Sequence, residues 1–278
     1  VGQRPYRSTT EHELESGLRE STGIESTAKK LRLPACPQAR VIGLPLVSGH
    51  VGADAAACLL AVDLAGSENL AAIMDIGTNT ELIVNGGGRL LAASCPAGPA
   101  FEGGAISCGM PGLEGAIESV RIDAEGTLSY KVIGDSPRAE GICGSGLVEL
   151  LGELLRSGRM DHLGRLTNEA DRFELPETDS VYLSEEDISQ LAQAKGANVS
   201  GLEIVMKNIG RSCEDLDRFY LAGGFASHLD LDSARRIGLI PDLPDEKITR
   251  IGNAAIEGAT LALLSTRRRL ELEETVSR

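Results

Sequence analysis

A polar turn between two apolar segments carries the residues best suited to chemistry. Asp75 supplies a carboxylate, and Gly77 lacks the side chain that would keep a phosphate group away. Thr78, Asn79 and Thr80 follow with hydroxyl, amide and backbone N–H donors. This composition suits the phosphates of a nucleotide with their metal ion. An ordinary hairpin, in which Asp and Asn only shape the turn, explains the same residues and stays an alternative.

A second glycine-rich segment opens a predicted helix. Residues 141–146 read Gly-Ile-Cys-Gly-Ser-Gly, and the leucines that follow to Arg156 share one helical face. Gly144, Ser145 and Gly146 would expose N–H groups at the start of this helix, where they could bind phosphate or hold a neighbouring loop. Helix capping with close packing is the alternative.

A third segment places two glycines between a predicted strand and a predicted helix. Gly223 and Gly224 follow the apolar run 219–222 and precede Phe225. A flat adenine or ribose could approach the backbone where any other side chain would block it. The alternative is a tight turn from strand to helix.

The six cysteines show no CxxC pair, which indicates reduced thiols rather than disulfides. Cys108 and Cys143 lie in glycine-rich loops near the proposed site, so a pair from each of two subunits could hold an iron–sulfur cluster. Small core residues are the interpretation that we favour for free cysteines. We therefore expect a colourless protein.

The composition limits the classes of partner. The chain has 278 residues, 42% of them hydrophobic, and a formal net charge of -14. A large core can form, whereas nucleic acid and anionic membranes are disfavoured as partners. No apolar run has transmembrane length and the start lacks the apolar core of a signal peptide, so we expect a cytoplasmic location.

The elements that must position these residues follow from hydrophobic patterns. Residues 1–69 carry helix signals rather than strand signals, with one helix capped by Ser8–Thr10 and an alanine-rich helix at about 51–64 that must pack closely. A strand meander follows at 70–75, 80–84 and 89–94, and then a glycine- and proline-rich loop at 95–106 and a hairpin insert at 115–134. A long helix is predicted at 184–209, and two strand–helix units are predicted at 219–237 and 247–270. This order predicts an α/β fold of the ribonuclease H-like type, as in actin-like ATPases, with a mixed sheet and a helical N-terminal segment.

Several segments resemble a known superfamily. Residues 75–81 look like the second phosphate motif of the ATP-binding superfamily of acetate and sugar kinases, Hsp70 and actin, and residues 222–225 look like its adenosine motif. Within that superfamily, four segments are similar to the reductive activators of corrinoid proteins: 97–103, 141–146, 237–242 and 252–259.

The resemblance implies ATP and Mg²⁺ as ligands. As the catalytic residue, Asp75 would hold Mg²⁺ through water or orient the attacking water. Phosphate and adenosine would contact the remaining candidates: Gly77, Thr78, Asn79, Thr80, Gly144, Ser145, Gly146, Gly223, Gly224 and Phe225.

The resemblance covers essentially the whole chain but leaves part of an activator out. Such activators also carry a plant-type [2Fe–2S] domain and an earlier Asp-Ile-Gly-Thr hairpin, neither of which occurs here. We therefore expect residues 1–69 to be the helical remnant of a first ribonuclease H-like domain and residues 70–278 to form the second. A [2Fe–2S] cluster is expected only in a missing N-terminal domain.

The resemblance predicts ATP-dependent reductive activation of a corrinoid protein from Co(II) to Co(I) within a methyltransferase system. The chain lacks an Asp-x-His-x-x-Gly motif for corrinoid binding, so it would act on a corrinoid partner. A homodimer could form. The alternatives are a small-molecule kinase of the same superfamily and a docking module without catalysis. With one phosphate hairpin, the chain alone should be weak or inactive as an ATPase.

Overall fold

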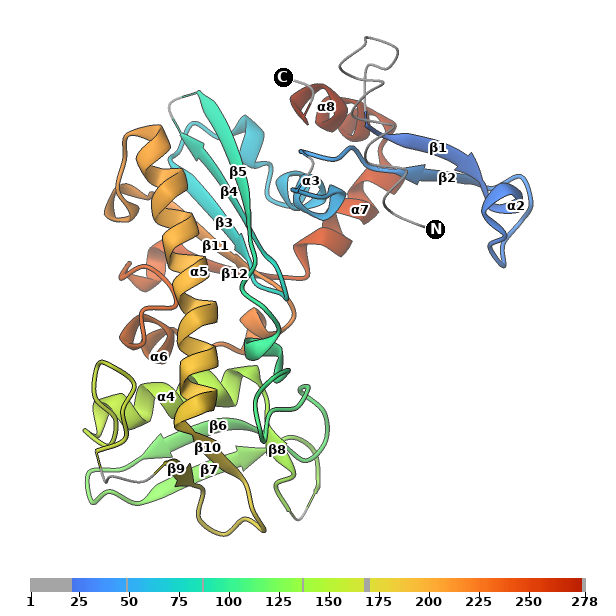
Figure 1. Cartoon of the computed structure of the whole chain (residues 1–278). Coiled ribbons are helices and arrows are strands. Elements are labelled where there is room, and N and C mark those ends of the chain that lie inside the picture. The colour runs from blue at the N-terminus through green and yellow to red at the C-terminus, as the bar shows by residue number, and fades with distance from the viewer. Residues whose placement is uncertain (1–21, 49, 87, 137, 168–170, 277–278) are drawn as a thin grey trace. The chain divides into compact units, whose positions relative to one another are not determined.

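The largest sheet has five strands in the order β12-β11-β3-β4-β5 (Figure 1). The computed structural model describes residues 22–48, 50–86, 88–136, 138–167 and 171–276. The strands of this sheet are β3 (Ala71–Asp75), β4 (Thr80–Gly86), β5 (Arg89–Cys95), β11 (Arg218–Ala222) and β12 (Ile248–Gly252).

The directions of these strands make the sheet mixed. β11 and β12 pair in parallel. The connections between β3, β4 and β5 are too short for the crossover that parallel neighbours need, so these strands run antiparallel to one another. The predicted meander, the later strand–helix units and the mixed sheet are confirmed.

The sheet is buried because its central strands are apolar. The first four residues of β3 and all of β4 are buried, as in a sheet that is covered on both faces. The long helix α5 (Glu185–Ile209) packs on β4 and β5, where Gly201 leaves room for Leu82 and Cys95. Its N-cap is Ser184, in a capping box with Asp187.

A smaller sheet contains the predicted hairpin insert. It has the order β7-β6-β8, with β6 (Ala116–Ile122) antiparallel to β7 (Leu128–Val132). The short strand β8 (Gly141–Ile142) pairs with β6 in parallel and leads directly into helix α4 (Gly144–Arg156). The insert and the helix were both predicted.

Helix α4 completes one edge of β6 with carboxylates. β8 pairs with β6 only as far as Ile117. Beyond it, Glu149 accepts a hydrogen bond from the N–H of Val120 at 2.9 Å, and Glu153 accepts one from Ile122 at 2.8 Å. Four helical residues rise about 6 Å and two strand residues about 6.6 Å, so the two periodicities match here.

The remaining elements are short. They are α2 (Ala28–Leu31), η1 (Leu64–Gly66), η2 (Ala100–Glu102), the hairpin of β9 (Arg172–Glu174) and β10 (Tyr182–Ser184), η3 (Cys213–Asp215), η4 (Phe225–His228), α6 (Leu231–Arg236) and η5 (Asp245–Lys247). The helix predicted up to residue 237 is therefore two short helices, η4 and α6. None of the helices in the described part of the chain is long and apolar enough to cross a bilayer.

We predicted helices and no strands for residues 1–69, and the prediction of no strands is wrong. β1 (Ile24–Thr27) and β2 (Arg40–Gly43) form an antiparallel pair. β-Branched residues in both segments fit a pleated ladder, and a cross-strand pair between Glu25 and Arg40 at 2.7 Å reinforces it. The alanine-rich helix is present as α3 (Ala53–Ala61). The helix predicted after Ser8–Thr10 lies outside the described residues.

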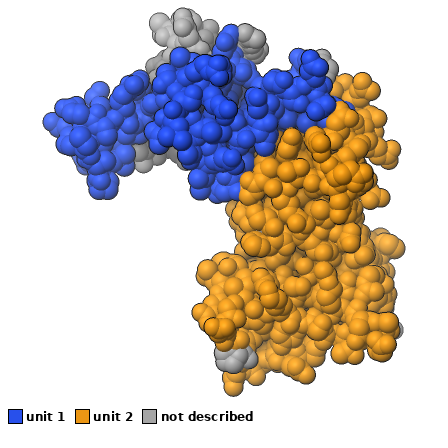
Figure 2. Space-filling view, turned by 180° about the vertical axis from the view of Figure 1, so that it is seen from behind, with its two compact units in different colours: residues 1–71, 83–93, 253–278 blue, residues 72–82, 94–252 orange. Residues whose placement is uncertain are grey.

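The chain divides into two compact units, coloured separately in Figure 2. Unit 1 contains residues 1–71, 83–93 and 253–278, and unit 2 contains residues 72–82 and 94–252. Residues 253–278 thus belong to the same compact unit as residues 1–71. The division into two ribonuclease H-like parts at residue 69 stays a prediction.

Close packing of two helices holds unit 1 together. α3 packs on α7 (Ala254–Leu264), and a side chain at Gly258 would overlap the backbone of Ala57. The predicted tight packing of the alanine-rich helix is therefore confirmed. The single helix predicted for 253–270 is wrong, because Ser265 is extended and separates α7 from α8 (Thr266–Val276).

The carboxylate of Glu153 should make stability depend on pH. A hydrogen bond from Arg156 is the main cause of its lowered pKa; burial opposes this shift and the N–H of Ile122 assists it. A carboxyl group whose pKa is lower in the folded state stabilises the fold at pH values above its pKa in the unfolded state. This stabilisation is lost as the pH falls through its pKa in the folded state. We expect Glu153→Gln to lower the free energy of unfolding by about 1–2 kcal/mol near neutral pH. The difference should shrink below about pH 4.

Denaturant unfolding at several pH values measures this effect. Glu203→Gln is the matched control, since Glu203 is an exposed helical carboxylate 3.8 Å from Lys207. Its substitution should cost less than about 0.5 kcal/mol at every pH. A cost for Glu153→Gln that does not change with pH would show that its charge has no role.

Candidate functional site

A pocket of about 540 Å³ in unit 2 brings several predicted segments together. Gly144, Ser145 and Gly224 line it, together with Ile76 at the end of β3 and Glu102 of η2. Its volume lies within the range of about 300–1,000 Å³ that small-molecule sites occupy.

The close approach of β3 to β11 places two of the predicted turns side by side. The N–H of Ile76 donates to the carbonyl of Ala222 at 3.0 Å. Gly223 has a φ of +107°, and a side chain there would overlap the carbonyl oxygen of Ile76. Gly223 is therefore required by the strand contact, which supports the tight-turn interpretation at this position.

Gly224 has different surroundings. A Cβ atom added to it would meet no heavy atom within 4 Å, and the residue lines the pocket. Its φ of -59° and ψ of -45° are open to any residue. The exposed backbone of Gly224 can therefore receive a flat ligand group. Phe225 begins η4, and its side chain lies outside the described residues.

The turn after β3 is held by the glycine- and proline-rich loop. The hydroxyl of Thr78 donates to Glu102 Oε2 at 2.6 Å, and the carbonyl of Thr78 accepts from the N–H of Gly98 at 2.9 Å. Glu102 Oε1 lies 3.7 Å from the position that a Cβ of Gly77 would take. A carboxylate therefore stands beside the proposed phosphate turn.

The same loop is anchored at its other end by a buried carboxylate. Asp187, which is 2% exposed, accepts from the N–H and the hydroxyl of Ser107 at 2.8 and 3.1 Å. Its second oxygen accepts from the N–H and hydroxyl of Ser184. Asp187, which forms the capping box of α5 with Ser184, thus also fixes the loop that carries Glu102.

The start of α4 contributes donors to the pocket. The first N–H groups of a helix have no partner within the helix, and Gly144 and Ser145 line the pocket. The hydroxyl of Ser145 donates to the carbonyl of Glu118 at 3.0 Å. Gly146 has a packing role instead, because a side chain there would overlap the carbonyl oxygen of Ile117.

Gly77 and Thr78 lie outside the pocket lining, as do Asp75, Asn79 and Thr80. Asp75 is the last residue of β3 and is half-buried. Asn79 is exposed in the turn. The prediction for the hydroxyl of Thr80 needs correction: this residue starts β4 and is 0% exposed, so its side chain cannot reach a ligand.

Sequence reasoning missed several residues that line the pocket, among them Glu102, Glu118 and His228. The signal for Glu102 was a charged residue in a loop that is otherwise apolar, between Phe101 and Gly103. For His228, no local pattern pointed to a ligand site.

The two cysteines of the cluster alternative have local partners. Cys143 is buried beside the pocket and its thiol donates to the carbonyl of Ile117 at 3.4 Å, while Cys108 accepts from the N–H of Tyr182 at 3.5 Å. All six cysteines lie within the described residues, and none of them forms a disulfide. Within the described ranges of this single chain, no group of three or more His, Cys, Asp or Glu residues could hold a metal ion.

Comparison with known proteins identifies relatives for most of the chain. A family model described as the C-terminal domain of RACo, the ASKHA domain, matches residues 69–278. The chain is 33% identical over 257 residues to "Corrinoid activation enzyme RamQ" of Eubacterium limosum, covering 84% of this chain and 43% of that protein. It is 28% identical over 236 residues to "[Co(II) methylated amine-specific corrinoid protein] reductase" of Methanosarcina barkeri, covering 78% and 43%.

A solved structure is also similar to this chain. A "Reductive activator for corrinoid, iron-sulfur protein" superposes with a TM-score of 0.81 at 33% identity, covering 91% of this chain and 43% of that one. The predicted actin-like ATPase fold is therefore confirmed. The chain spans less than half the length of these relatives.

The two neighbouring glycines offer a matched test of the pocket. Gly224→Val should weaken nucleotide binding at least about tenfold, yet change the free energy of unfolding by less than about 1 kcal/mol, because the new side chain enters open space. Gly223→Ala should destabilise the fold by more than about 2 kcal/mol, because of its positive φ and the overlap with Ile76.

Thermal unfolding with and without millimolar MgADP separates binding from folding in both variants. Equal destabilisation by the two substitutions, with unchanged nucleotide-induced stabilisation for Gly224→Val, would assign Gly224 to packing.

Proposed function

This chain belongs to the family of C-terminal RACo domains, the ASKHA domains, and we propose that it is the nucleotide-binding part of a reductive activator of corrinoid proteins. The relatives named above are a corrinoid activation enzyme, a corrinoid protein reductase and a reductive activator. The observation that carries the proposal is the pocket in which Gly224, the start of α4 and the turn after β3 meet.

The proposed reaction moves one electron to Co(II) of a corrinoid partner and gives Co(I). The electron comes from a [2Fe–2S] cluster outside this chain. Binding and hydrolysis of ATP drive a conformational change that makes this transfer possible, without phosphate transfer to a product. The partner is a corrinoid protein of a methyltransferase system in the cytoplasm, and a homodimer is a further prediction.

The residues of the pocket fit a nucleotide. The open face of Gly224 would receive adenosine. The N–H groups of Gly144 and Ser145 and the turn residues Gly77 and Thr78 would receive phosphate oxygens, since helix N-termini and glycine turns favour anions. Gly144 and Ser145 line the pocket, as does Glu102, which accepts the hydrogen bond from Thr78, so a single ligand could reach both sets of donors.

The residues also fit one Mg²⁺ ion with few protein ligands. Mg²⁺ keeps several waters and is usually held by one or two carboxylates plus phosphates. Asp75 would hold it through water, and Glu102 adds a carboxylate beside the phosphate turn. The ion, when bound, neutralises charge on the phosphate oxygens. Without it, the charge of Glu102 opposes a phosphate group next to Thr78.

This electrostatic conflict gives a test of Glu102. Glu102→Gln removes the charge and keeps a hydrogen-bonding group toward Thr78. With EDTA, the variant should bind ATP about three- to tenfold more tightly than the wild type, and added Mg²⁺ should reduce or reverse the difference.

Isothermal titration calorimetry measures both conditions. Glu125→Gln, an exposed residue in the turn between β6 and β7, is the control and should behave as the wild type does. If Mg²⁺ increases affinity equally in Glu102→Gln and wild type, Glu102 has no part in metal binding.

The short chain should bind ATP weakly and hydrolyse it at a negligible rate. Its described residues contain one phosphate hairpin, and loss of several charge-assisted hydrogen bonds of about 1.5–3 kcal/mol each lowers affinity by orders of magnitude. Calorimetry and phosphate release should be compared with a chain extended to the length of the relatives, with and without a corrinoid protein. Micromolar affinity with turnover by the short chain would show that the site is already complete.

A further inference from the structure

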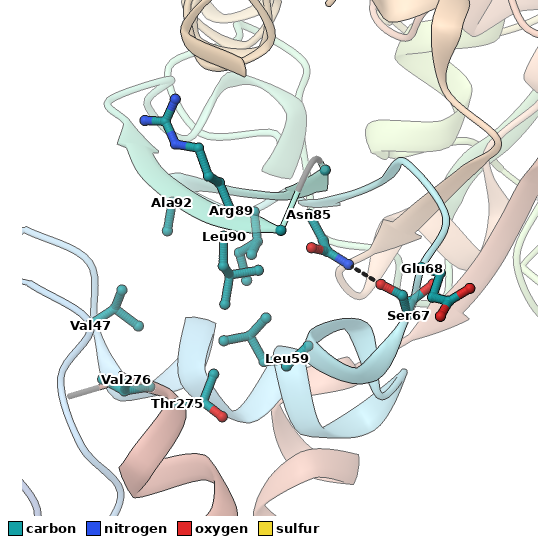
Figure 3. Close-up of a pocket in the computed structure, with 14 residues that line it drawn as sticks. Val47, Leu59, Ser67, Glu68, Asn85, Arg89, Leu90, Ala92, Thr275 and Val276 are labelled. Carbon is teal, nitrogen blue, oxygen red and sulfur yellow. Dashed lines mark hydrogen bonds between the residues drawn. The ribbon is translucent and has the colours of Figure 1, made fainter. Parts of the chain in front are cut away.

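Unit 1 contains a second cavity, of about 810 Å³, which has no part in the proposed reaction (Figure 3). It lies between one face of β4 and β5, helix α3 with the segment after it, and the end of α8. Half of the fourteen residues that line it are aliphatic: Val47, Leu59, Ala65, Ile83, Leu90, Ala92 and Val276.

One polar side chain faces this cavity in a fixed orientation. Asn85 is 7% exposed, and its amide nitrogen donates to the carbonyls of Leu64 at 2.9 Å and Ser67 at 2.6 Å. Both amide hydrogens are therefore used. Reversal of the amide would place its oxygen against two carbonyl oxygens, so the contacts fix which atom faces inward.

The oxygen of Asn85 is left as an acceptor for a ligand. Figure 3 shows it on the side of the amide away from Ser67, toward Leu90. In the part of the chain that the structure describes, Asn85 Oδ1 accepts no hydrogen bond, and it is not sealed from the cavity. A donor group bound in the cavity could therefore pair with it.

The charged residues of the lining do not face inward. Figure 3 shows the guanidinium of Arg89 pointing away from the cavity, and Glu68 is exposed at the rim. The hydroxyl of Thr275 donates to the carbonyl of Glu271 at 2.8 Å. A charged ligand would lose hydration here without a partner for its charge, whereas a neutral one would lose little.

We propose that this cavity binds a neutral, mainly apolar small molecule that donates one hydrogen bond to Asn85 Oδ1. The aliphatic walls supply affinity, and the oriented carbonyl of Asn85 supplies the selectivity for a donor. The inference rests on unit 1 alone, so it is independent of the nucleotide pocket.

A pair of fluorescent probes tests the proposal on the unmodified chain. N-phenyl-1-naphthylamine is neutral, aromatic and has one N–H donor, and N-methyl-N-phenyl-1-naphthylamine has a methyl group in place of the donor hydrogen. The first should bind at one saturable site with a blue-shifted, enhanced emission. The second should bind about three- to tenfold more weakly, because one hydrogen bond is lost. Equal affinity of the two probes would overturn the role of Asn85.

Two neighbouring substitutions test the location. Ala92→Phe fills the cavity and should weaken binding of the N–H probe at least about tenfold. Ala93→Phe places the same ring on the opposite face of β5 and should change the affinity less than about twofold. Thermal unfolding checks that both variants fold, and the probe pair on the wild type decides the outcome if one does not. Unchanged binding by Ala92→Phe, or no saturable binding by the wild type, would overturn the proposal.

Discussion

The hydrogen bond from Ile76 to Ala222 at 3.0 Å is the contact on which the candidate site depends. It joins the ends of β3 and β11, which are separated by more than a hundred residues of sequence. The approach is possible only because Gly223 has no side chain against the carbonyl of Ile76. As a result Ile76, the first residue after β3, and the exposed backbone of Gly224 border one pocket. Gly223 acts through geometry, and Gly224 offers the contact surface.

Side-chain carboxylates do much of the positioning in this unit. Asp187 ties the loop of Ser107 to the start of α5, and Glu102 in the same loop meets the phosphate turn. Glu149 and Glu153 replace a strand along β6 while the start of the same helix, α4, faces the pocket. Each buried carboxylate accepts hydrogen bonds that offset its loss of hydration. Loops too rich in glycine and proline for regular structure are thereby held in place.

Much of the fold could be predicted because it is encoded by local patterns. The apolar runs of β3 and β4, the alternation in β6 and β7, and the cap at Ser184 all gave elements close to those observed. The failures also have local causes. A strand pair near the N-terminus was missed because its short segments are interrupted by a proline-rich loop, and their pairing depends on partners 13 to 19 residues away. The helix break at Ser265 carries no glycine or proline signal.

The residue types of the site follow from local sequence alone: a carboxylate turn, a glycine-rich helix start and a glycine pair after a strand. The sequence could not separate packing from ligand contact at each position, because that depends on which atoms lie opposite. The tertiary structure gave Gly146 and Gly223 close backbone contacts, buried Thr80, left Gly224 open, and brought in Glu102 from a loop with no regular pattern. Residue spacing along a chain fixes which elements form, whereas only the packing of those elements decides which side chains and backbone atoms share a pocket.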